Sequence, residues 1–284
     1  MVFRKIAFIL FGLFLLNVRS TVFAEEINLG KIIVTASRID ELLDKSSRKV
    51  DVVTSSEIES SGAENLSDLL TPLSSVNMTD NGGAGGVKNI RMRGSSAAQV
   101  LVMVDGRPVN NPRDGSADLG SVSLDDVERV EVLHGPASSL YGSQAMGGTV
   151  NVITKRPPKD HQEFEITSSG GSFRTLLERM SYGNRFGQLG CMVNTEYRTS
   201  GGFRDNTEYD AKDANGRFEY QLNEENTLNF NTGYFRNRAG APGPITSPDA
   251  DDKQKEVKDY FDLGWNCKPE DATDSLYTRG VFIA

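Results

Sequence analysis

The 284-residue chain contains only two histidines, two cysteines and one tryptophan. The histidines, His134 and His161, and the cysteines, Cys191 and Cys267, lie far apart in the sequence. Zinc sites and nucleophile systems built around histidine need several such residues close together. This scarcity argues against a zinc site, and no segment offers a nucleophile beside a base, so we do not expect an enzyme.

Positive charge is also in deficit, with 31 basic residues against 39 acidic ones and a formal net charge of -8. This balance argues against nucleic acid or an anionic surface as a partner. The hydrophobic content of 37% is low for a globular protein, while 28 glycines are present and aromatic residues are not scarce. The mixture suits a strand-rich protein with a wet interior.

The only long apolar run lies at the start of the chain. Arg4 and Lys5 precede apolar residues 6–16, and small residues lead up to Ala24. A transmembrane helix is the alternative, but it would need about 18 to 20 apolar residues. We therefore predict a secretory signal peptide at residues 1–24, which would take the chain out of the cytoplasm.

From residue 49 to residue 158 the pattern indicates a mixed α/β unit. Two capping-box patterns, Thr54–Glu57 and Ser61–Glu64, predict helix starts, and the second would lead into a helix at 65–70. Asp105-Gly106 predicts a tight turn between strands. The expected strands are at residues 49–53, 89–93, 100–104, 107–109, 129–134 and 147–154.

After residue 158 the chain changes to segments of about ten residues in which apolar and polar positions alternate. They lie at 163–169, 176–182, 189–198, 213–222, 227–236, 257–268 and 275–284. A soluble β-sandwich would also alternate, but typically in strands of about five or six residues. Short turns alternate here with longer loops at 199–212 and 237–256. This pattern favours antiparallel strands of a transmembrane β-barrel.

Each of these segments has two different faces. In segment 257–268, Phe261, Leu263 and Trp265 share one face, which we expect to contact lipid. Polar residues of the other face, such as Arg217 and Glu219 in segment 213–222, are expected to line a solvated lumen. Cys191 and Cys267 both fall on the lipid side, three strands apart at about 4.8 Å each, too far for a disulfide.

Several motifs resemble the TonB-dependent outer-membrane receptors. They are Ile90–Gly94, Val102–Gly106, Val127–Val132, Gly135–Gly142 and Ala145–Thr154. The resemblance implies an α+β plug domain at residues 49–158 and the N-terminal part of a transmembrane barrel at 159–284. Barrels that enclose a plug use about 22 strands. The seven segments are therefore expected to belong to a truncated chain.

The resemblance also implies a location in the outer membrane of a Gram-negative bacterium, in contact with its lipid, and a role in the energised uptake of a scarce, large nutrient. The expected ligand is cobalamin or a ferric siderophore. The part of the chain most similar to the cobalamin-transporter branch is the glycine-rich segment 81–86 together with segment 95–104. A passive pore or an adhesin without energised transport is the alternative function.

The N-terminal tail, residues 25–48, contains a strand-forming segment that is similar to a TonB box. An extended, β-branched segment can add a strand to a partner's sheet edge. An ordinary first strand of the plug is the alternative. The residues expected to bind periplasmic TonB are Lys31, Ile32, Ile33, Val34, Thr35 and Ala36.

Two further sites lie in the plug region. A glycine-rich loop is expected to face the ligand, with a plain linker as the alternative; it consists of Asn81, Gly82, Gly83, Gly85 and Gly86. In the family, an arginine at the position of Arg93 and a second one before Gly135-Pro136 tie the plug to barrel carboxylates. Here the second residue is His134, so that tie is expected to be weak or pH-sensitive, or else His134 faces solvent.

The two long loops are rich in carboxylates. Members of the cobalamin branch use calcium in such loops, so the resemblance implies a calcium site here, whereas a solvated acidic rim is the alternative. No other cofactor is expected. The candidate ligands are Asp205, Glu208, Asp210, Asp213, Asp249 and Asp251.

Overall fold

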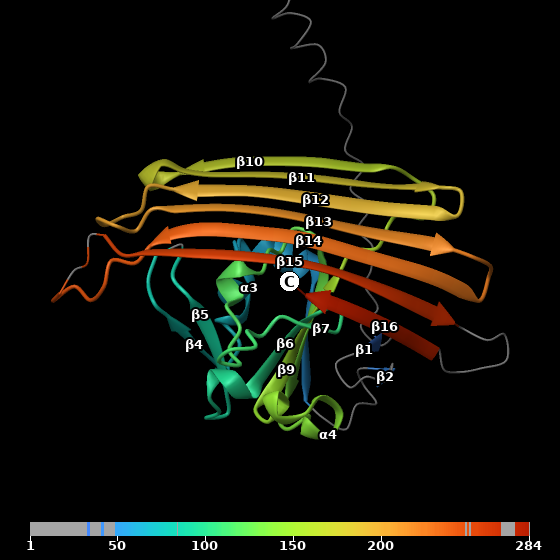
Figure 1. The fold of residues 1–284 in the computed structure, drawn as a ribbon, viewed down its shortest axis with the longest axis horizontal. Helices are drawn as coiled ribbons and strands as arrows, with labels where there is room; N and C mark the ends of the chain where they lie inside the picture. Colours follow the sequence, from blue (N-terminus) through green and yellow to red (C-terminus); the bar gives the residue numbers. More distant parts are fainter. Residues whose placement is uncertain are drawn as a thin grey trace, which may run out of the picture.

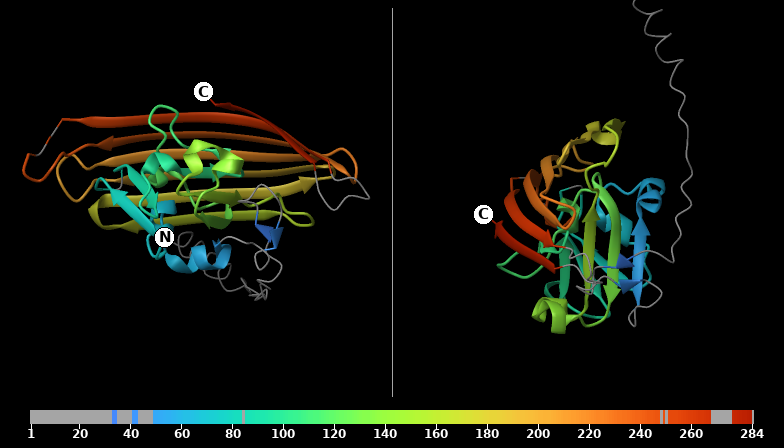
Figure 2. Two further views of the ribbon diagram at one scale, coloured as in Figure 1. Left: turned by 90° about the horizontal axis from the view of Figure 1, so that it is seen from below. Right: turned by 90° about the vertical axis from the view of Figure 1, so that its right-hand side faces the viewer.

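The computed structural model describes residues 33–34, 41–42, 49–83, 85–247, 249, 251–267 and 276–283; for 33–34, 41–42 and 276–283 it describes the backbone alone. The chain forms two layers that meet along their length (Figures 1 and 2). One layer is an α+β unit, which we call the plug. The other is a curved sheet of seven strands, β10 to β16, which we call the wall.

A five-stranded sheet forms the centre of the plug, in the order β3-β8-β9-β6-β7. Only β6 and β9 run parallel to each other. A separate hairpin of β4 and β5 packs beside this sheet. The strands are β3 (Val50–Thr54), β4 (Val76–Asp80), β5 (Lys88–Met92), β6 (Val100–Val104), β7 (Arg107–Pro108), β8 (Val127–His134) and β9 (Gly148–Thr154).

The helices of the plug are short: α2 (Ser55–Ser61), α3 (Leu66–Leu70) and α4 (Ser138–Tyr141), with single turns η3 (Ala97–Gln99), η4 (Leu119–Ser121) and η5 (Ser143–Ala145). The predicted capping box of Thr54 and Glu57 starts α2. The prediction of a second box at Ser61–Glu64 is wrong, because Ser61 still belongs to α2. Instead, the side chain of Asn65 accepts from the backbone N–H of Asp68 at 3.2 Å and caps α3.

Apolar side chains from all these elements form the plug core. Leu66, Leu70, Ile90, Val102 and Val130 are each at most 1% exposed. The predicted turn at Asp105 and Gly106 joins β6 to β7, and both residues have positive φ values, 49° and 75°. Two successive left-handed residues match the twist of a tight hairpin.

All neighbouring strands of the wall are antiparallel and follow the order of the sequence. They are β10 (Glu163–Gly171), β11 (Thr175–Phe186), β12 (Leu189–Ser200), β13 (Tyr209–Gln221), β14 (Asn226–Gly240), β15 (Lys253–Cys267) and β16 (Leu276–Ile283), with the turn η6 (Ser172–Arg174) between β10 and β11. Connections at one end are short (187–188, 222–225), and two at the other end are long (201–208, 241–252). We call the latter the long-loop end.

The predicted division of wall strands into two faces is confirmed for β11 to β15. On the outer face, Phe261, Leu263 and Trp265 are 49%, 55% and 44% exposed. On the inner face of the same strand, Asp262 is only 1% exposed, because it points toward the plug. Both cysteines are free, as expected from their separation.

Two residues of the expected TonB box, Ile33 and Val34, form strand β1. Their backbone pairs antiparallel with β2 (Glu41–Leu42), with Ile33 opposite Leu42. The other four residues of the box and the predicted signal peptide lie outside the described residues.

Candidate functional site: the joint between plug and wall

The glycine loop lies against the wall at its long-loop end. It joins β4 to β5 and is closed by a hydrogen bond from the Asn81 N–H to the Val87 carbonyl, at 3.2 Å. A Cβ on Gly85 would lie 2.2 Å from the Cβ of Ala239 and 2.7 Å from the Tyr209 ring. Only glycine fits this approach, so the loop is positioned by the wall. Its contact with a ligand stays a prediction.

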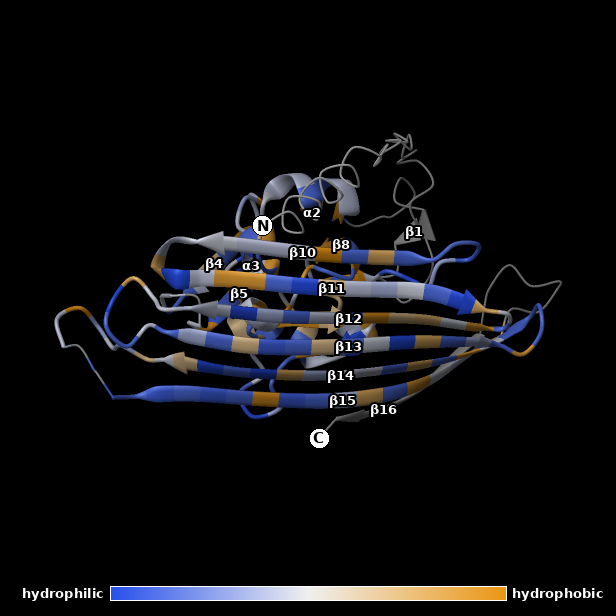
Figure 3. Ribbon diagram, turned by 90° about the horizontal axis from the view of Figure 1, so that it is seen from above, coloured by the Kyte–Doolittle hydropathy of each residue, from blue (hydrophilic) through white to orange (hydrophobic). Residues whose placement is uncertain are grey.

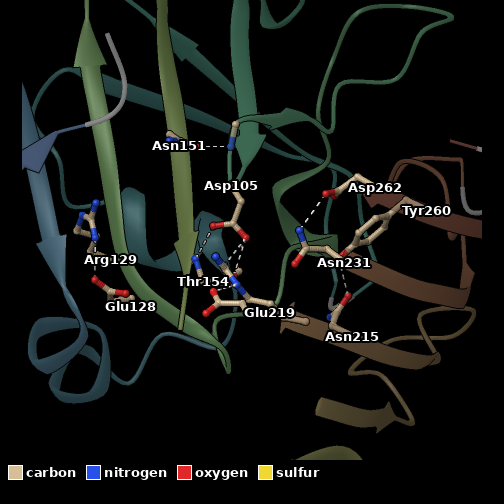
Figure 4. A network of polar contacts seen from close by, with 12 residues as sticks. Asp105, Glu128, Arg129, Asn151, Thr154, Asn215, Glu219, Asn231, Tyr260 and Asp262 are labelled. Atoms are coloured by element: carbon tan, nitrogen blue, oxygen red, sulfur yellow. Dashed lines mark hydrogen bonds and ion pairs between the residues drawn. The ribbon is translucent and has the colours of Figure 1, made fainter. Parts of the chain in front are cut away.

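A first polar contact crosses the joint beside the β6–β7 turn. The Arg217 guanidinium on β13 donates to Thr154 Oγ1 at 2.9 Å and lies 3.3 Å from Asp105 Oδ2. Thr154 in turn donates to Asp105 Oδ2 at 2.6 Å (Figure 4). On the wall side, Arg217 also pairs with Glu219 at 3.2 Å. The β6–β7 turn, strand β9 and the wall therefore share one network.

A second contact joins the plug segment before β8 to wall strands β11 and β12. Arg179 pairs with both Asp125 of the plug and Glu196 of the wall, the latter at 3.1 Å. Ser123 donates to Glu196 at 3.2 Å, and Arg198 pairs with Glu196 at 3.2 Å. Glu196 is 6% exposed and Arg198 is 5% exposed, so this cluster is enclosed between the two layers.

The carboxyl groups of this plug segment have shifted pKa values. Burial, followed by the neighbouring Glu196 carboxylate, raises the pKa of Asp125 to about 8. Burial, followed by repulsion from Asp105, raises the pKa of Asp126 to about 6. Both groups therefore change protonation near neutral pH, at the surface where the plug meets the wall.

A third set of contacts involves strand β15. The Arg107 guanidinium lies over the Tyr260 ring, 3.5 Å from its centroid, and the Tyr260 hydroxyl donates to Asn215 at 3.2 Å. Figure 4 shows Tyr260 pointing from the wall toward the plug. Lys258 donates to Ser121 of the plug at 3.0 Å. Guanidinium groups over aromatic rings are attracted by the ring's negative face.

The expectation that Arg217 and Glu219 line a solvated lumen is wrong, because the plug covers this face. The sequence carried a usable signal: charged and polar side chains recur at alternate positions of β11 to β15 that face inward. The alternation predicted which wall side chains face inward. Which plug residue each of them contacts depends on where the plug surface lies, and the sequence pattern does not give that. Sequence reasoning therefore missed Asp105, Asp125, Arg179 and Glu196 as joint residues.

Arg93 and His134, the two residues predicted to tie the plug to the barrel, lie in different surroundings. Arg93 is exposed, and its guanidinium lies 3.0 Å from where a Cβ of Gly135 would be. Its pairing with a barrel carboxylate stays a prediction. His134 does not face solvent, because it is 3% exposed. Its ring nitrogens lie 2.7 Å from Asp51 Oδ2 and 3.0 Å from Ser75 Oγ, so its partners belong to the plug itself.

The predicted calcium site does not assemble among the described residues. No group of three or more acidic, histidine or cysteine side chains there is arranged to hold a metal ion. Glu208 pairs with Lys253, and Asp249 accepts from the backbone N–H groups of Asp251 and Asp252 at 2.9 Å each. Asp213 lies within β13 on the inner face, apart from the loops. These oxygens are committed to other partners or placed elsewhere, so they do not fit calcium.

Comparisons with known proteins agree with this architecture. Residues 43–149 match the family model of the TonB-dependent Receptor Plug Domain. The Vitamin B12 transporter BtuB of Vibrio cholerae serotype O1 is 35% identical over 162 residues, which cover 57% of this chain and 26% of that protein. Within the described ranges, no helix is long and apolar enough to span a membrane.

Solved structures share the fold. The ferric citrate transporter FecA superposes with a TM-score of 0.69 at 22% identity, over 85% of this chain and 40% of that one. FpvA of P. aeruginosa, solved bound to pyoverdines, gives 0.72 at 18% identity, over 84% and 34%. Residues 43–149 are thus similar to the plug domain of the TonB-dependent receptors, and the antiparallel wall strands that follow share the fold of these solved structures. The chain spans about a quarter of the length of the curated transporter.

Proposed function

We propose that this protein is a TonB-dependent transporter in the outer membrane of a Gram-negative bacterium, taking up cobalamin or a ferric siderophore. The observation that carries the proposal is the polar joint. A plug held in its channel by ion pairs and hydrogen bonds can be released by work done on its N-terminal tail, because polar groups exchange these partners for water at modest net cost.

TonB would bind residues 31–36 as a strand added to its own sheet, and a pull on this strand would supply the energy for transport. The extended backbone of Ile33 and Val34, already paired with β2, supports this role. The joint also favours a transporter over a passive pore or an adhesin. Neither of these would need a plug that is tied to the wall by the Arg217 and Arg179 networks.

Replacing Val34 with proline tests the coupling. Proline removes a backbone donor and disrupts strand addition, so uptake of radiolabelled cobalamin or ferric siderophore by energised cells should stop. Binding of the same ligand to whole cells at 0 °C should not change. Val34→Thr, which keeps the β-branched backbone preference, is the matched control and should transport normally. Uptake by the proline variant at the control's rate would refute the coupling.

The ligand is tested separately by equilibrium binding. We favour cobalamin, because the relative with 35% identity is a Vitamin B12 transporter. Binding of a ferric siderophore without binding of cobalamin would overturn that choice and leave the transporter class intact.

A further inference from the structure

The two long loops are joined to each other by side chains of the first loop. Both loops leave the wall at the same end and extend beyond the strands, next to the hydrophilic end of β15 (Figure 3). Two residues of loop 201–208, Arg204 and Asn206, reach across to loop 241–252. We call these two side chains, with their contacts on the second loop, the clasp.

The Arg204 guanidinium donates to two successive carbonyl groups of the second loop. Its Nη2 lies 2.7 Å from the Pro242 oxygen and 2.8 Å from the Gly243 oxygen. The backbone of Arg204 is itself held, because its N–H donates to Thr207 Oγ1 at 3.1 Å and its carbonyl accepts from that hydroxyl at 2.5 Å. Hydrogen bonds with a charged donor are stronger than those between neutral groups. Arg204 therefore connects the loops by charge-assisted bonds from a fixed backbone.

The Asn206 side chain uses both ends of its amide. Its Nδ2 donates to the Asp249 carbonyl at 3.1 Å and to the Asp252 carbonyl at 2.9 Å. Its Oδ1 accepts from Lys253 Nζ at 2.8 Å. Asn206 is 8% exposed and has a positive φ of 58°, which asparagine tolerates better than most residues. Both its side chain and its backbone therefore suit asparagine at this position.

Loop 241–252 presents its carbonyl groups to the clasp because its backbone folds back on itself. The Asp249 N–H donates to the Pro242 carbonyl at 2.8 Å, and the Ala241 N–H donates to the Asp252 carbonyl at 3.0 Å. These bonds bring the two ends of the loop together in front of the first loop. The carbonyl oxygens that accept from the clasp belong to Pro242, Gly243, Asp249 and Asp252.

The clasped loops also contact the glycine loop of the plug. Thr207, next to Asn206 in the chain, is 5% exposed, and a Cβ on Gly83 would lie 3.8 Å from its Cβ. Gly85 packs against the ends of β13 and β14 that adjoin the two long loops. The position of the long loops and the position of the glycine loop are therefore linked.

Positive groups of the protein occupy the place that a metal ion would need. Calcium in such loops would bind carboxylates and backbone carbonyls. Here the carbonyls accept from Arg204 and Asn206. Lys253 pairs with Glu208 and also donates to Asn206. A divalent cation at this place would lie beside two positive side chains and would be repelled by them.

We propose that Arg204 and Asn206 are positioning residues that order the two long loops in the place of calcium, so that ligand binding by this protein is independent of that ion. The inference rests on the uptake function proposed above, since it assumes that the ligand binds between the long loops and the glycine loop. A clasp made of side chains is present at any calcium concentration. Loop order would therefore not vary with the medium outside the cell.

Hydrogen exchange of the purified protein in detergent, followed by mass spectrometry, tests the order of the loops without any ligand. In the unchanged protein, the amides of segment 241–252 should exchange at the same rate in calcium chloride and in EGTA. Arg204→Ala should raise their exchange rate on the order of 10-fold to 100-fold, because it removes two charge-assisted hydrogen bonds. Asn206→Asp keeps the size of the side chain but loses the Nδ2 donor, and it should act in the same direction.

A control variant combines Asp205→Asn and Asp251→Asn. Both side chains are exposed, both were candidate calcium ligands, and neither belongs to the clasp, so exchange should stay as in the unchanged protein. Equal exchange in the control and in both clasp variants would overturn the proposal. Slower exchange of the unchanged protein in calcium than in EGTA would also overturn it, and that comparison needs no variant.

Equilibrium binding of cobalamin supplies the functional readout. Its affinity should be equal in calcium and in EGTA. Arg204→Ala should lower this affinity by about tenfold, because only the molecules with ordered loops are competent to bind. Calcium-dependent affinity in the unchanged protein would contradict the proposal. If cobalamin does not bind at all, the ligand chosen above is wrong, and the exchange experiment still decides whether the clasp orders the loops.

Discussion

Single carboxyl groups make the joint between plug and wall sensitive to pH. Asp125 and Glu196 lie on opposite sides of the joint and share Arg179. Two carboxylates that share one cation in a buried site are most stable when one of them holds a proton. The raised pKa of Asp125, about 8, reflects this arrangement.

The pH dependence of stability follows from this shift. The folded protein holds a proton on Asp125 that the unfolded chain releases near the ordinary pKa of about 4, so this stabilisation is complete below that pH and is lost as the pH rises through 8. We expect the melting temperature to fall between pH 6 and pH 9, by roughly 2–4 °C for each kcal/mol. Asp125→Asn should flatten this profile, as measured by thermal unfolding. An unchanged slope in that variant would contradict the assignment.

Gly85 limits the size of side chain that the loop can carry. A Gly85→Ala change would force its Cβ against Ala239 and should destabilise the protein by about 1–3 kcal/mol. Combining it with Ala239→Gly should restore part of the loss, because that change removes the nearest atom while the Tyr209 ring, at 2.7 Å, stays in place. Gly170→Ala is the control, since its Cβ would meet only an ordinary contact at 3.7 Å. Denaturant unfolding of the four proteins gives the comparison.

Among the elements, the wall strands were predictable because alternation with period two is a local signal. All seven were predicted, and β13 to β15 extend further than expected, to 13, 15 and 15 residues. The extra residues at 253–256 carry three charges, and those at 237–240 include Asn237 and Arg238, so the alternation of apolar and polar positions is lost there. Pairing with the neighbouring strand extends the ladder past the alternating segment.

Other elements needed tertiary information. Strand β4 was missed because Val76–Asp80 is half polar and is held in place by pairing with β5. The predicted surroundings of His134 and Arg217 were wrong because they, too, depend on tertiary contacts. His134 is buried by Asp51 and Ser75, which are distant in sequence, and Arg217 meets the plug only after the two layers come together.

The outer face of the wall supplies a prediction at the scale of the strand. Leu263→Arg should impair assembly into membranes by about 2–4 kcal/mol, because its side chain lies near the middle of the apolar face. Asn229→Arg, on the inner face of the adjacent strand, should be tolerated far better. Folding into lipid vesicles, followed by gel mobility before and after heating, measures both. Equal effects of the two changes would contradict the assignment of the faces.

For the molecule as a whole, the joint is a set of polar contacts rather than an apolar interface. A double-mutant cycle on Asp105→Asn and Arg217→Gln measures its strength. Asparagine tolerates the positive φ of 49° at this turn, so the single change should leave the hairpin intact. We expect a coupling of about 1–3 kcal/mol from unfolding experiments. A coupling near zero would show that the first network does not hold the plug.

The position of β3 at the edge of the plug sheet determines how a mechanical load would act. This strand pairs only with β8, and the tail leads into its first residue, Val50. A pull on the tail directed across β3 would break the β3–β8 hydrogen bonds one after another, starting from Val50, rather than all at once. The side-chain tie between Asp51 and His134 stands at the second residue of the strand and would be loaded almost first. The tail end of the plug could thus yield at a small force while the sheet of β8, β9 and β6 stays folded.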